Sequence, residues 1–283
     1  MPRRLGQHFL YDPAILDRIV DAIAPQPDDV VLEVGPGEGT LTRRLAPRVG
    51  RVVAIERDAR LVAALRSGDG HGNHAPMPEN VTVIEADALA LDWHQAVLTS
   101  DAHRRSAIGH RPTANGQPPF KVIGNIPYYV TSPLIEQALQ PPMPAVVVFL
   151  VQREVADRVV AAPGSRTYGA LSVGVQAFTR AERLFVVRAG SFQPPPTVDS
   201  AVLRLTPLAE PAITLAERAP FRVFVVGLFG QRRKQLGRAL RGVAGLTAEG
   251  AVAVCETSGV SPTARPETLS VVEMVRVFRT TMR

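Results

Sequence analysis

The sequence predicts an α/β protein in which a mainly parallel sheet, with helices on both faces, precedes a small all-α domain. Short apolar, β-branched runs alternate with helical patterns up to about residue 205, as is typical of strands buried on both faces of a parallel sheet. A glycine-rich turn follows the first of these runs. After Pro207 only helical patterns remain, so we place the domains at 1–205 and 206–283.

Each expected element follows from its local pattern. The expected strands are rich in β-branched residues and lie at 29–34, 51–58, 81–84, 121–123, 146–151 and 200–205. The expected helices lie at 40–49, 59–67, 215–230, 231–241, 248–257 and 270–282. The segments 171–178 and 184–187 have the pattern of a strand pair.

Two segments, 68–79 and 99–119, interrupt this order and are rich in Gly, Pro, His and Asn. We expect surface loops there. They contain His71, His74, His103 and His110. No cysteine or carboxylate spacing accompanies these histidines, so we expect no metal site. The single cysteine, Cys255, excludes an internal disulfide.

The charge balance favours a polyanionic partner. Lys and Arg number 32 against 26 acids, a net charge of +6, which makes nucleic acid the first candidate. A scattered surface charge is the alternative. No apolar stretch reaches the ~18 residues of a membrane span, and the N-terminus lacks the apolar core of a signal peptide. We therefore expect a cytoplasmic protein with no membrane partner. We also expect a monomer.

The glycine-rich turn and two acidic strand ends predict a nucleotide-like cofactor. Gly35 and Gly37 lie between a strand and a helix, where glycine lets a ligand approach the backbone. Glu56 ends the next strand and can accept both ribose hydroxyls. Asp87 ends the strand after that and can accept an adenine amino group. The G-x-G-x-G spacing differs from that of a pyrophosphate loop and favours S-adenosylmethionine. As an alternative, either acid could be a helix N-cap.

Asn125, Ile126, Pro127 and Tyr128 directly follow a predicted strand and suit methyl transfer to N6 of adenine. That nitrogen is a poor nucleophile because its lone pair is delocalised into the ring. The Asn125 oxygen and the Ile126 carbonyl can accept its two hydrogens, while Pro127 fixes the backbone. Tyr128 can stack on the base. No general base is required, since the alkylated nitrogen is strongly acidic. The alternative is an ordinary loop with a proline turn.

These motifs resemble those of the KsgA-type small-subunit rRNA adenine N6,N6-dimethyltransferases over nearly the whole chain. The matching segments are 6–10, 32–41, 55–56, 87, 124–129, 151–158, 168–173, 192–202 and 229–234. The resemblance implies a Rossmann-like class I methyltransferase sheet. The implied substrate is a pair of adjacent adenosines in the 3′-terminal hairpin of small-subunit (16S) rRNA, each methylated twice. The segment 99–119 is longer than the family leads us to expect.

The resemblance also implies further site residues. The implied cofactor contacts are His8, Leu10, Gly35, Glu56, Asp87 and Asn125. The segment of His8 and Leu10 folds over the methionine end of the cofactor in this family. Phe192 is implied as a second aromatic wall for the target adenine, opposite Tyr128. The alternative for Phe192 is a place in the core.

A basic segment from Gln231 to Arg241 predicts an RNA-binding surface. Its cations are Arg232, Arg233, Lys234, Arg238 and Arg241. Leu236 and Leu240 can pack on one side of a helix while the cations face phosphates. A solvated basic helix is the alternative. Weaker candidates are Arg3, Arg4, Arg153 and Arg158. The expected partner is the small ribosomal subunit.

Three other functions compete with this prediction. A large-subunit rRNA adenine methyltransferase that confers macrolide resistance shares the chemistry, but segments 192–202 and 229–234 favour the small-subunit type. The intact Glu56, Asp87 and Asn125 argue against a non-catalytic assembly factor. The glycine spacing argues against a nicotinamide dehydrogenase.

Overall fold

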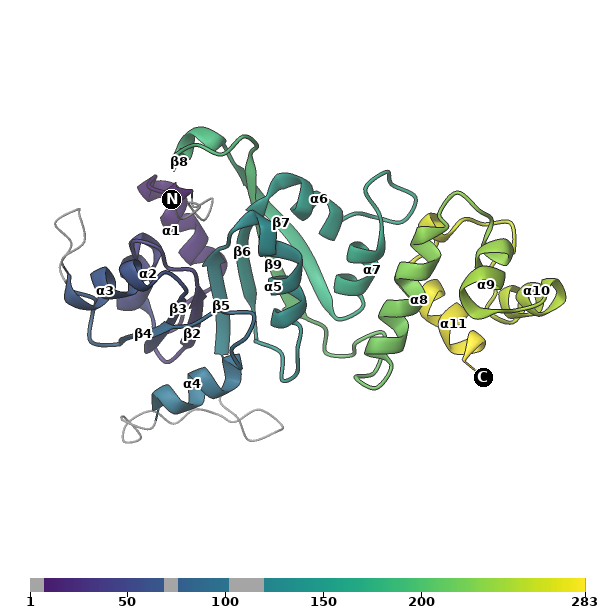
Figure 1. Cartoon of the computed structure of the whole chain (residues 1–283), viewed down its shortest axis with the longest axis horizontal. Helices are drawn as coiled ribbons and strands as arrows, with labels where there is room; N and C mark the ends of the chain where they lie inside the picture. Colours follow the sequence, from purple (N-terminus) through teal and green to yellow (C-terminus); the bar gives the residue numbers. More distant parts are fainter. Residues whose placement is uncertain (1–7, 69–75, 102–119, 283) are drawn as a thin grey trace. The chain divides into compact units, whose positions relative to one another are not determined.

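The computed structural model describes residues 8–68, 76–101 and 120–282 (Figure 1). The chain divides into two compact units. The first comprises Met1–Ala156 and Glu182–Thr206, and the second comprises Asp157–Ala181 and Pro207–Arg283. The division expected from the sequence assigns residues 157–181 to the first domain, whereas in the structure they pack with the C-terminal helices.

A sheet of seven strands among the described residues has the order β4-β3-β2-β5-β6-β9-β7. The strands are β2 (Val30–Val34), β3 (Arg51–Glu56), β4 (Val81–Glu85), β5 (Phe120–Asn125), β6 (Val147–Gln152), β7 (Thr179–Val187) and β9 (Ser200–Pro207). The five strands from β4 to β6 pair in parallel, and β9 is antiparallel to β6. The expected mainly parallel sheet is confirmed.

Burial on both faces explains why these segments form strands. Every residue of β2, with the sequence Val-Val-Leu-Glu-Val, is buried, as expected for a strand covered by helices on each side. The helices between the strands are α1 (Pro13–Ala22), α2 (Thr40–Leu45), α3 (Ala59–Ser67), α4 (Trp93–Asp101), α5 (Thr131–Ala138) and α6 (Arg153–Val159). Asp12 caps α1 by accepting from the backbone N–H groups of Ala14 and Ile15.

A second, two-stranded sheet fixes the N-terminal segment. The short strand β1 (Phe9–Leu10) pairs antiparallel with β8 (Phe192–Gln193), which places Leu10 opposite Phe192. Both side chains are buried in a hydrophobic cluster with Leu16 of α1 and Leu41 of α2. The segment before α1 is therefore held by a partner far along the chain.

The second unit is helical. Its helices, besides the end of α6, are α7 (Ala170–Gln176), α8 (Arg218–Gly230), α9 (Leu236–Ala244), α10 (Ala248–Thr257) and α11 (Val271–Thr281). The ring of Phe278 lies 5.3 Å from that of Phe221 and 5.6 Å from that of Phe224. These aromatic contacts join α8 to α11. Within the described residues, no helix is long and apolar enough to span a membrane.

Two expected elements are wrong. A strand was expected at 171–178, but residues 170–176 form helix α7 and residues 177–178 a turn, because a short apolar run suits a buried helix as well as a strand. The Ser172 hydroxyl accepts from Gly169 N–H at the start of this helix and donates to the Arg158 carbonyl. The helix expected at 231–241 begins only at Leu236, because Gln235 is extended and residues 231–234 form a turn.

Tyr168→Phe should destabilise the second unit. Tyr168 is fully buried and its hydroxyl donates to the Leu269 carbonyl at 2.9 Å. Its removal leaves a buried acceptor without a partner, at a cost of about 1–3 kcal/mol. The matched control is Tyr11→Phe, which removes an exposed hydroxyl that donates to Gly190 and should cost under about 0.5 kcal/mol. Urea unfolding measures both, and equal midpoints for Tyr168→Phe and wild type would contradict this account.

Candidate active site

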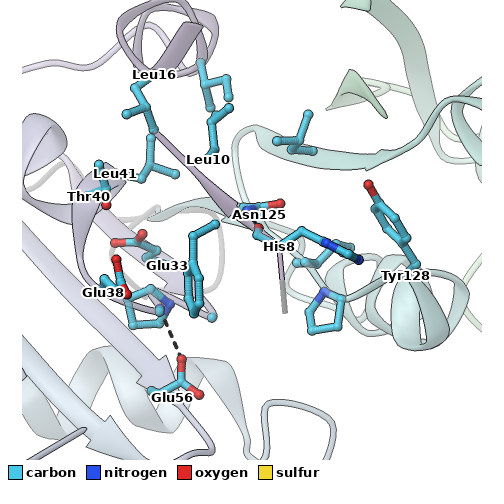
Figure 2. Close-up of a pocket in the computed structure, with 18 residues that line it drawn as sticks. His8, Leu10, Leu16, Glu33, Glu38, Thr40, Leu41, Glu56, Asn125 and Tyr128 are labelled. Atoms are coloured by element: carbon cyan, nitrogen blue, oxygen red, sulfur yellow. Dashed lines mark hydrogen bonds between the residues drawn. The ribbon is translucent and has the colours of Figure 1, made fainter. Parts of the chain in front are cut away.

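A pocket opens at the carboxyl ends of β2, β3 and β5 in the first unit (Figure 2). Ligands of open α/β sheets bind at this edge. The predicted site residues that line the pocket are His8, Leu10, Gly35, Gly37, Glu56, Asn125, Ile126, Pro127 and Tyr128. The sheet thus brings most of the expected cofactor residues together with residues 125–128, hereafter the reactive loop.

The turn between β2 and α2 approaches the pocket with its backbone. Gly35 and Gly37 have φ values of +68° and +59°, in the left-handed region that favours glycine. A Cβ atom on Gly37 would lie 2.9 Å from the Phe9 ring, too close for a side chain to fit. Glycine is therefore needed both for the turn and for the space beside it.

Glu56 is buried at the end of β3 and binds the glycine turn. Its Oε2 accepts from Gly37 N–H at 3.1 Å, and its Oε1 accepts from the N–H groups of Arg57 and Asp58 at 2.8 and 2.9 Å. The N-cap of α3 is Asp58, which accepts from Arg60 N–H. Glu56 is thus not the cap of this helix, and its carboxylate faces the pocket.

Asp87 lies in a smaller adjoining pocket. The residues lining this second pocket include Gly35, Glu56, Arg57, Asp87, Leu89, Pro127 and Tyr129. Asp87 Oδ1 accepts from Leu89 N–H at 3.0 Å, and Oδ2 lies 3.4 Å from Arg57 Nη1. Because Gly35, Glu56 and Pro127 line both pockets, a ligand in the first can extend to Asp87.

The reactive loop is ordered by the N-terminal segment. The Asn125 Nδ2 amide donates to the His8 carbonyl at 3.0 Å, so the amide oxygen is the group of this side chain that can accept from a ligand. Pro127 has a φ of −59° and precedes a 3₁₀ turn at Tyr128–Val130. Asn125 and Ile126 therefore line the pocket directly before a turn whose backbone is restricted by Pro127.

Tyr128 is half-buried and held from two sides. Its hydroxyl shares a hydrogen bond of 2.7 Å with the Ser200 hydroxyl, and burial raises the pKa of the phenol above its usual range. The His8 ring stacks on it with centroids 5.7 Å apart. His8 Nδ1 in turn donates to the Pro194 carbonyl. Both rings are thus fixed at the pocket wall.

Phe192 does not line the pocket. It is 2% exposed and packs in the hydrophobic cluster beneath β1, opposite Leu10. The sequence-based expectation of an aromatic wall there differs from the structure, because pairing of β8 with β1 turns the ring into the core. The structure favours the alternative, in which Phe192 anchors the loop.

Glu33 is a pocket residue that sequence reasoning missed. It lies in β2 and is 1% exposed, and its Oε2 has no hydrogen-bond partner among the described residues. Burial, together with the nearby charge of Glu56, raises the pKa of Glu33 to about 7. A charged residue inside an otherwise apolar strand was the signal that could have identified it.

The basic segment lies in the second unit. Lys234, Arg238 and Arg241 line a hollow together with Gln231, whose Oε1 accepts from Lys234 Nζ at 3.0 Å. Arg232 and Arg233 are exposed in the preceding turn and are not among the residues lining the hollow. The weaker candidates Arg153 and Arg158 lie in α6, and Arg3 and Arg4 lie outside the described residues.

The described part of the chain contains no group of three or more His, Cys, Asp or Glu side chains that could hold a metal ion. The histidines of the two expected loops lie outside the described residues. They are His71, His74, His103 and His110.

Comparison with known proteins identifies relatives along the whole chain. Residues 2–282 match the family described as ribosomal RNA adenine dimethylase. Ribosomal RNA small subunit methyltransferase A of Xanthomonas campestris pv. campestris is 38% identical, over 97% of this chain and 94% of that protein. The protein of the same name from Synechococcus elongatus is 41% identical, over 95% of this chain and 91% of that protein.

Two solved structures share the fold. The 23S rRNA methyltransferase ErmE has a TM-score of 0.67 and 27% identity, over 97% of this chain and 100% of that one. A dimethyladenosine transferase from Plasmodium falciparum has a TM-score of 0.71 and 24% identity, over 95% of this chain and 96% of that one.

The strand order and the pocket at the strand ends, together with these structural matches, define a class I methyltransferase with a Rossmann-like sheet. The match over residues 2–282 and the identities of 38–41% then decide the family. The chain belongs to the ribosomal RNA adenine dimethylase family. It is an rRNA methyltransferase, as its motifs predicted.

Phe192→Ala should lower stability and not the specific activity of the folded protein. Truncating a core Phe costs about 3–5 kcal/mol, which thermal unfolding will measure as a large fall in Tm. Phe192→Leu, the matched control, keeps most of the apolar volume and should restore most of the stability. A ring that stacks on adenine would behave differently: both variants would lose turnover while Tm stayed near that of the wild type.

Proposed function

We propose that this enzyme dimethylates N6 of two adjacent adenosines in the 3′-terminal hairpin of small-subunit (16S) rRNA, using S-adenosylmethionine, during ribosome biogenesis in the cytoplasm. One observation carries the proposal. The Asn125 amide and the Tyr128 ring line the same pocket as the glycine turn and Glu56. A methyl donor and an adenine amino group bound there would be neighbours.

The residues present fit S-adenosylmethionine. Glycine at positions 35 and 37 leaves this part of the pocket wall without side chains, so a ligand can lie against the backbone of the turn. The unpartnered Oε2 of Glu33 can accept from a cationic group. The groups that would hold the cofactor are Glu56 at the ribose, Asp87 at the adenine amino group, and His8 and Leu10 at the methionine end. When bound, the cofactor supplies an electrophilic methyl group on its sulfonium.

Asn125 and Ile126 prepare the target nitrogen. The His8 carbonyl holds the Asn125 Nδ2, so the amide oxygen can accept one N6 hydrogen while the Ile126 carbonyl accepts the other. This arrangement keeps the nitrogen lone pair out of the ring system and turned toward the donor. The proton is lost to solvent after transfer, because the alkylated nitrogen is strongly acidic.

Tyr128 offers a stacking surface for the target base. An adenine must leave its helical stack before its N6 can be reached. Base–aromatic stacking is worth about 1–3 kcal/mol, so it replaces part of the stacking energy that the adenine loses when it leaves the RNA helix. Because Ser200 holds the Tyr128 hydroxyl, the ring is oriented before the base arrives.

The relatives favour the small subunit as substrate. Relatives named for the small subunit are 38–41% identical, whereas ErmE, named for 23S rRNA, is 27% identical. The pocket itself does not distinguish small-subunit rRNA from large-subunit rRNA, because methyl transfer to N6 of adenine is the same reaction in both.

The hollow in the second unit is the proposed phosphate site. Lys234, Arg238 and Arg241 bring three cations to one concave surface, and Gln231 adds a donor. RNA phosphates are bound by such clusters with a strong dependence on salt. Arg232 and Arg233 lie just before the hollow and are proposed to contact phosphates beside it.

Wild-type enzyme should methylate purified 30S particles that lack the modification and leave 50S particles unlabelled. Mapping of labelled methyl groups by mass spectrometry should place them on two adjacent adenosines. Asn125→Ala should lower the rate by about a hundredfold or more, because the N6 hydrogens lose an oriented acceptor. Labelling of 50S alone would identify a large-subunit enzyme, and labelling of neither particle would refute the proposal.

Replacing Lys234, Arg238 and Arg241 by Gln should weaken binding to 30S particles and flatten its salt dependence. Each lost phosphate contact should reduce the slope of log affinity against log salt by about 0.7–0.9. The matched control replaces Arg166, Arg265 and Arg276, exposed cations of the same unit that are not among the residues lining the hollow. Equal slopes for the two triple variants would show that the hollow does not bind RNA.

A further inference from the structure

Gln152 carries a side-chain amide that makes no hydrogen bond among the described residues. It is the last residue of β6, which lies between β5 and β9 in the sheet (Figure 1). The side chain is partly buried. Because an amide has two donor hydrogens and an acceptor oxygen, this position can still bind a ligand.

The sheet places Gln152 on the face that the pocket uses. Side chains alternate along a strand, so Gln152 and Leu150 lie on the same face. Leu150 lines the pocket and is the partner of Asn125 in the parallel pairing of β5 with β6. Gln152 lies nearer than Leu150 to the carboxyl end of the strand, the end at which the reactive loop leaves β5.

The strand register also brings Gln152 close to the Tyr128 ring. In the antiparallel pairing of β6 with β9, Gln152 lies opposite Ser200, and paired residues share a face of the sheet. Opposite residues in such a pair have Cα atoms about 4.5–5.5 Å apart. The Ser200 hydroxyl is 2.7 Å from the Tyr128 hydroxyl. The Gln152 amide can therefore reach the space at the hydroxyl end of the ring proposed to stack on the target base.

The groups assigned so far recognise an amino group on a flat base, but they do not select adenine. Asn125 and Ile126 would accept hydrogens from an exocyclic amino group, which cytosine also carries. Tyr128 can stack on any base, because every base has a π-face. Adenine differs from cytosine at N7, which is an acceptor beside the amino group where cytosine has only a C–H group. A donor directed at N7 would complete the recognition of adenine.

We propose that Gln152 Nε2 donates a hydrogen bond to N7 of the target adenine and so selects adenine in the pocket. The inference rests on the proposed methylation of N6 of adenine. Glutamine suits this contact, since it is a side chain that reads adenine at N7 in nucleic acids. The contact leaves both N6 hydrogens to Asn125 and Ile126, so Gln152 is a specificity residue and takes no part in methyl transfer.

Substrates that differ by one atom test the contact. They are 30S particles reconstituted with 16S rRNA that carries adenosine, 7-deazaadenosine or 1-deazaadenosine at both target positions. On adenosine, Gln152→Leu should lower kcat/KM about tenfold, the effect of one lost hydrogen bond to a base. On 7-deazaadenosine, wild type and Gln152→Leu should be equal, because the acceptor is already absent. On 1-deazaadenosine, which keeps N7, the tenfold difference should persist.

Two further variants separate recognition from folding. Gln152→Glu keeps the length of the side chain but removes the donor, so it should behave like Gln152→Leu. Gln26→Ala, the matched control, removes an exposed glutamine from the connection before β2, at the amino ends of the strands, and should match wild type on all substrates. Affinity for S-adenosylhomocysteine and Tm should stay near those of the wild type for all of these variants.

The outcomes that overturn the inference are distinct. An equal loss by Gln152→Leu on all of the substrates would show a structural effect, because such an effect does not depend on N7. A difference that vanished only on 1-deazaadenosine would assign the contact to N1. An unchanged rate on adenosine would show that Gln152 does not contact the base. Absence of methylation of ordinary adenosine by the wild type is a different result, which would refute the proposed function itself.

Discussion

The backbone hydrogen bonds that pair β2 with β3 on one side and with β5 on the other set where the groups of the pocket lie. Because these strands are parallel, their carboxyl ends reach the same edge of the sheet. In this register Val34 lies opposite Ile55, and Glu33 lies opposite Ile123. The glycine turn, Glu56 and the reactive loop therefore begin beside one another. Burial of both strand faces specifies this register, since a slip would displace the apolar side chains.

The sequence was sufficient to predict the sheet and most of the pocket, because both depend on local patterns. Each motif directly follows a β-branched run, and strand ends meet in any parallel sheet. Prediction from local patterns failed where one segment fits two kinds of secondary structure equally well. The apolar run at 171–178 could be a strand or a buried helix, and its packing with the second unit decides for α7. The delayed start of α9 depends on the extended backbone of Gln235.

Two site features could not be read from the sequence because they depend on contacts between distant segments. Phe192 is turned into the core by pairing with Leu10, and no local pattern records that pairing. The protonation of Glu33 depends on how completely neighbouring elements exclude water from β2. In both cases the sequence gives the residue type, but the surroundings of the side chain are known only from the structure. Chemical roles inferred from motifs are therefore safest for backbone turns and strand ends, and least safe for side chains whose exposure is set by tertiary packing.

The β1–β8 pairing has a consequence for the newly made chain. The Asn125 amide is oriented by the His8 carbonyl, His8 is anchored by Pro194, and β1 is held by Phe192 and Gln193. The nascent protein therefore cannot complete the contacts that position the Asn125 amide until residue 194 has left the exit tunnel. An rRNA methyltransferase thus emerges from the ribosome in an incomplete form, and a chain truncated before β8 would retain the glycine turn without the contacts that hold the reactive loop.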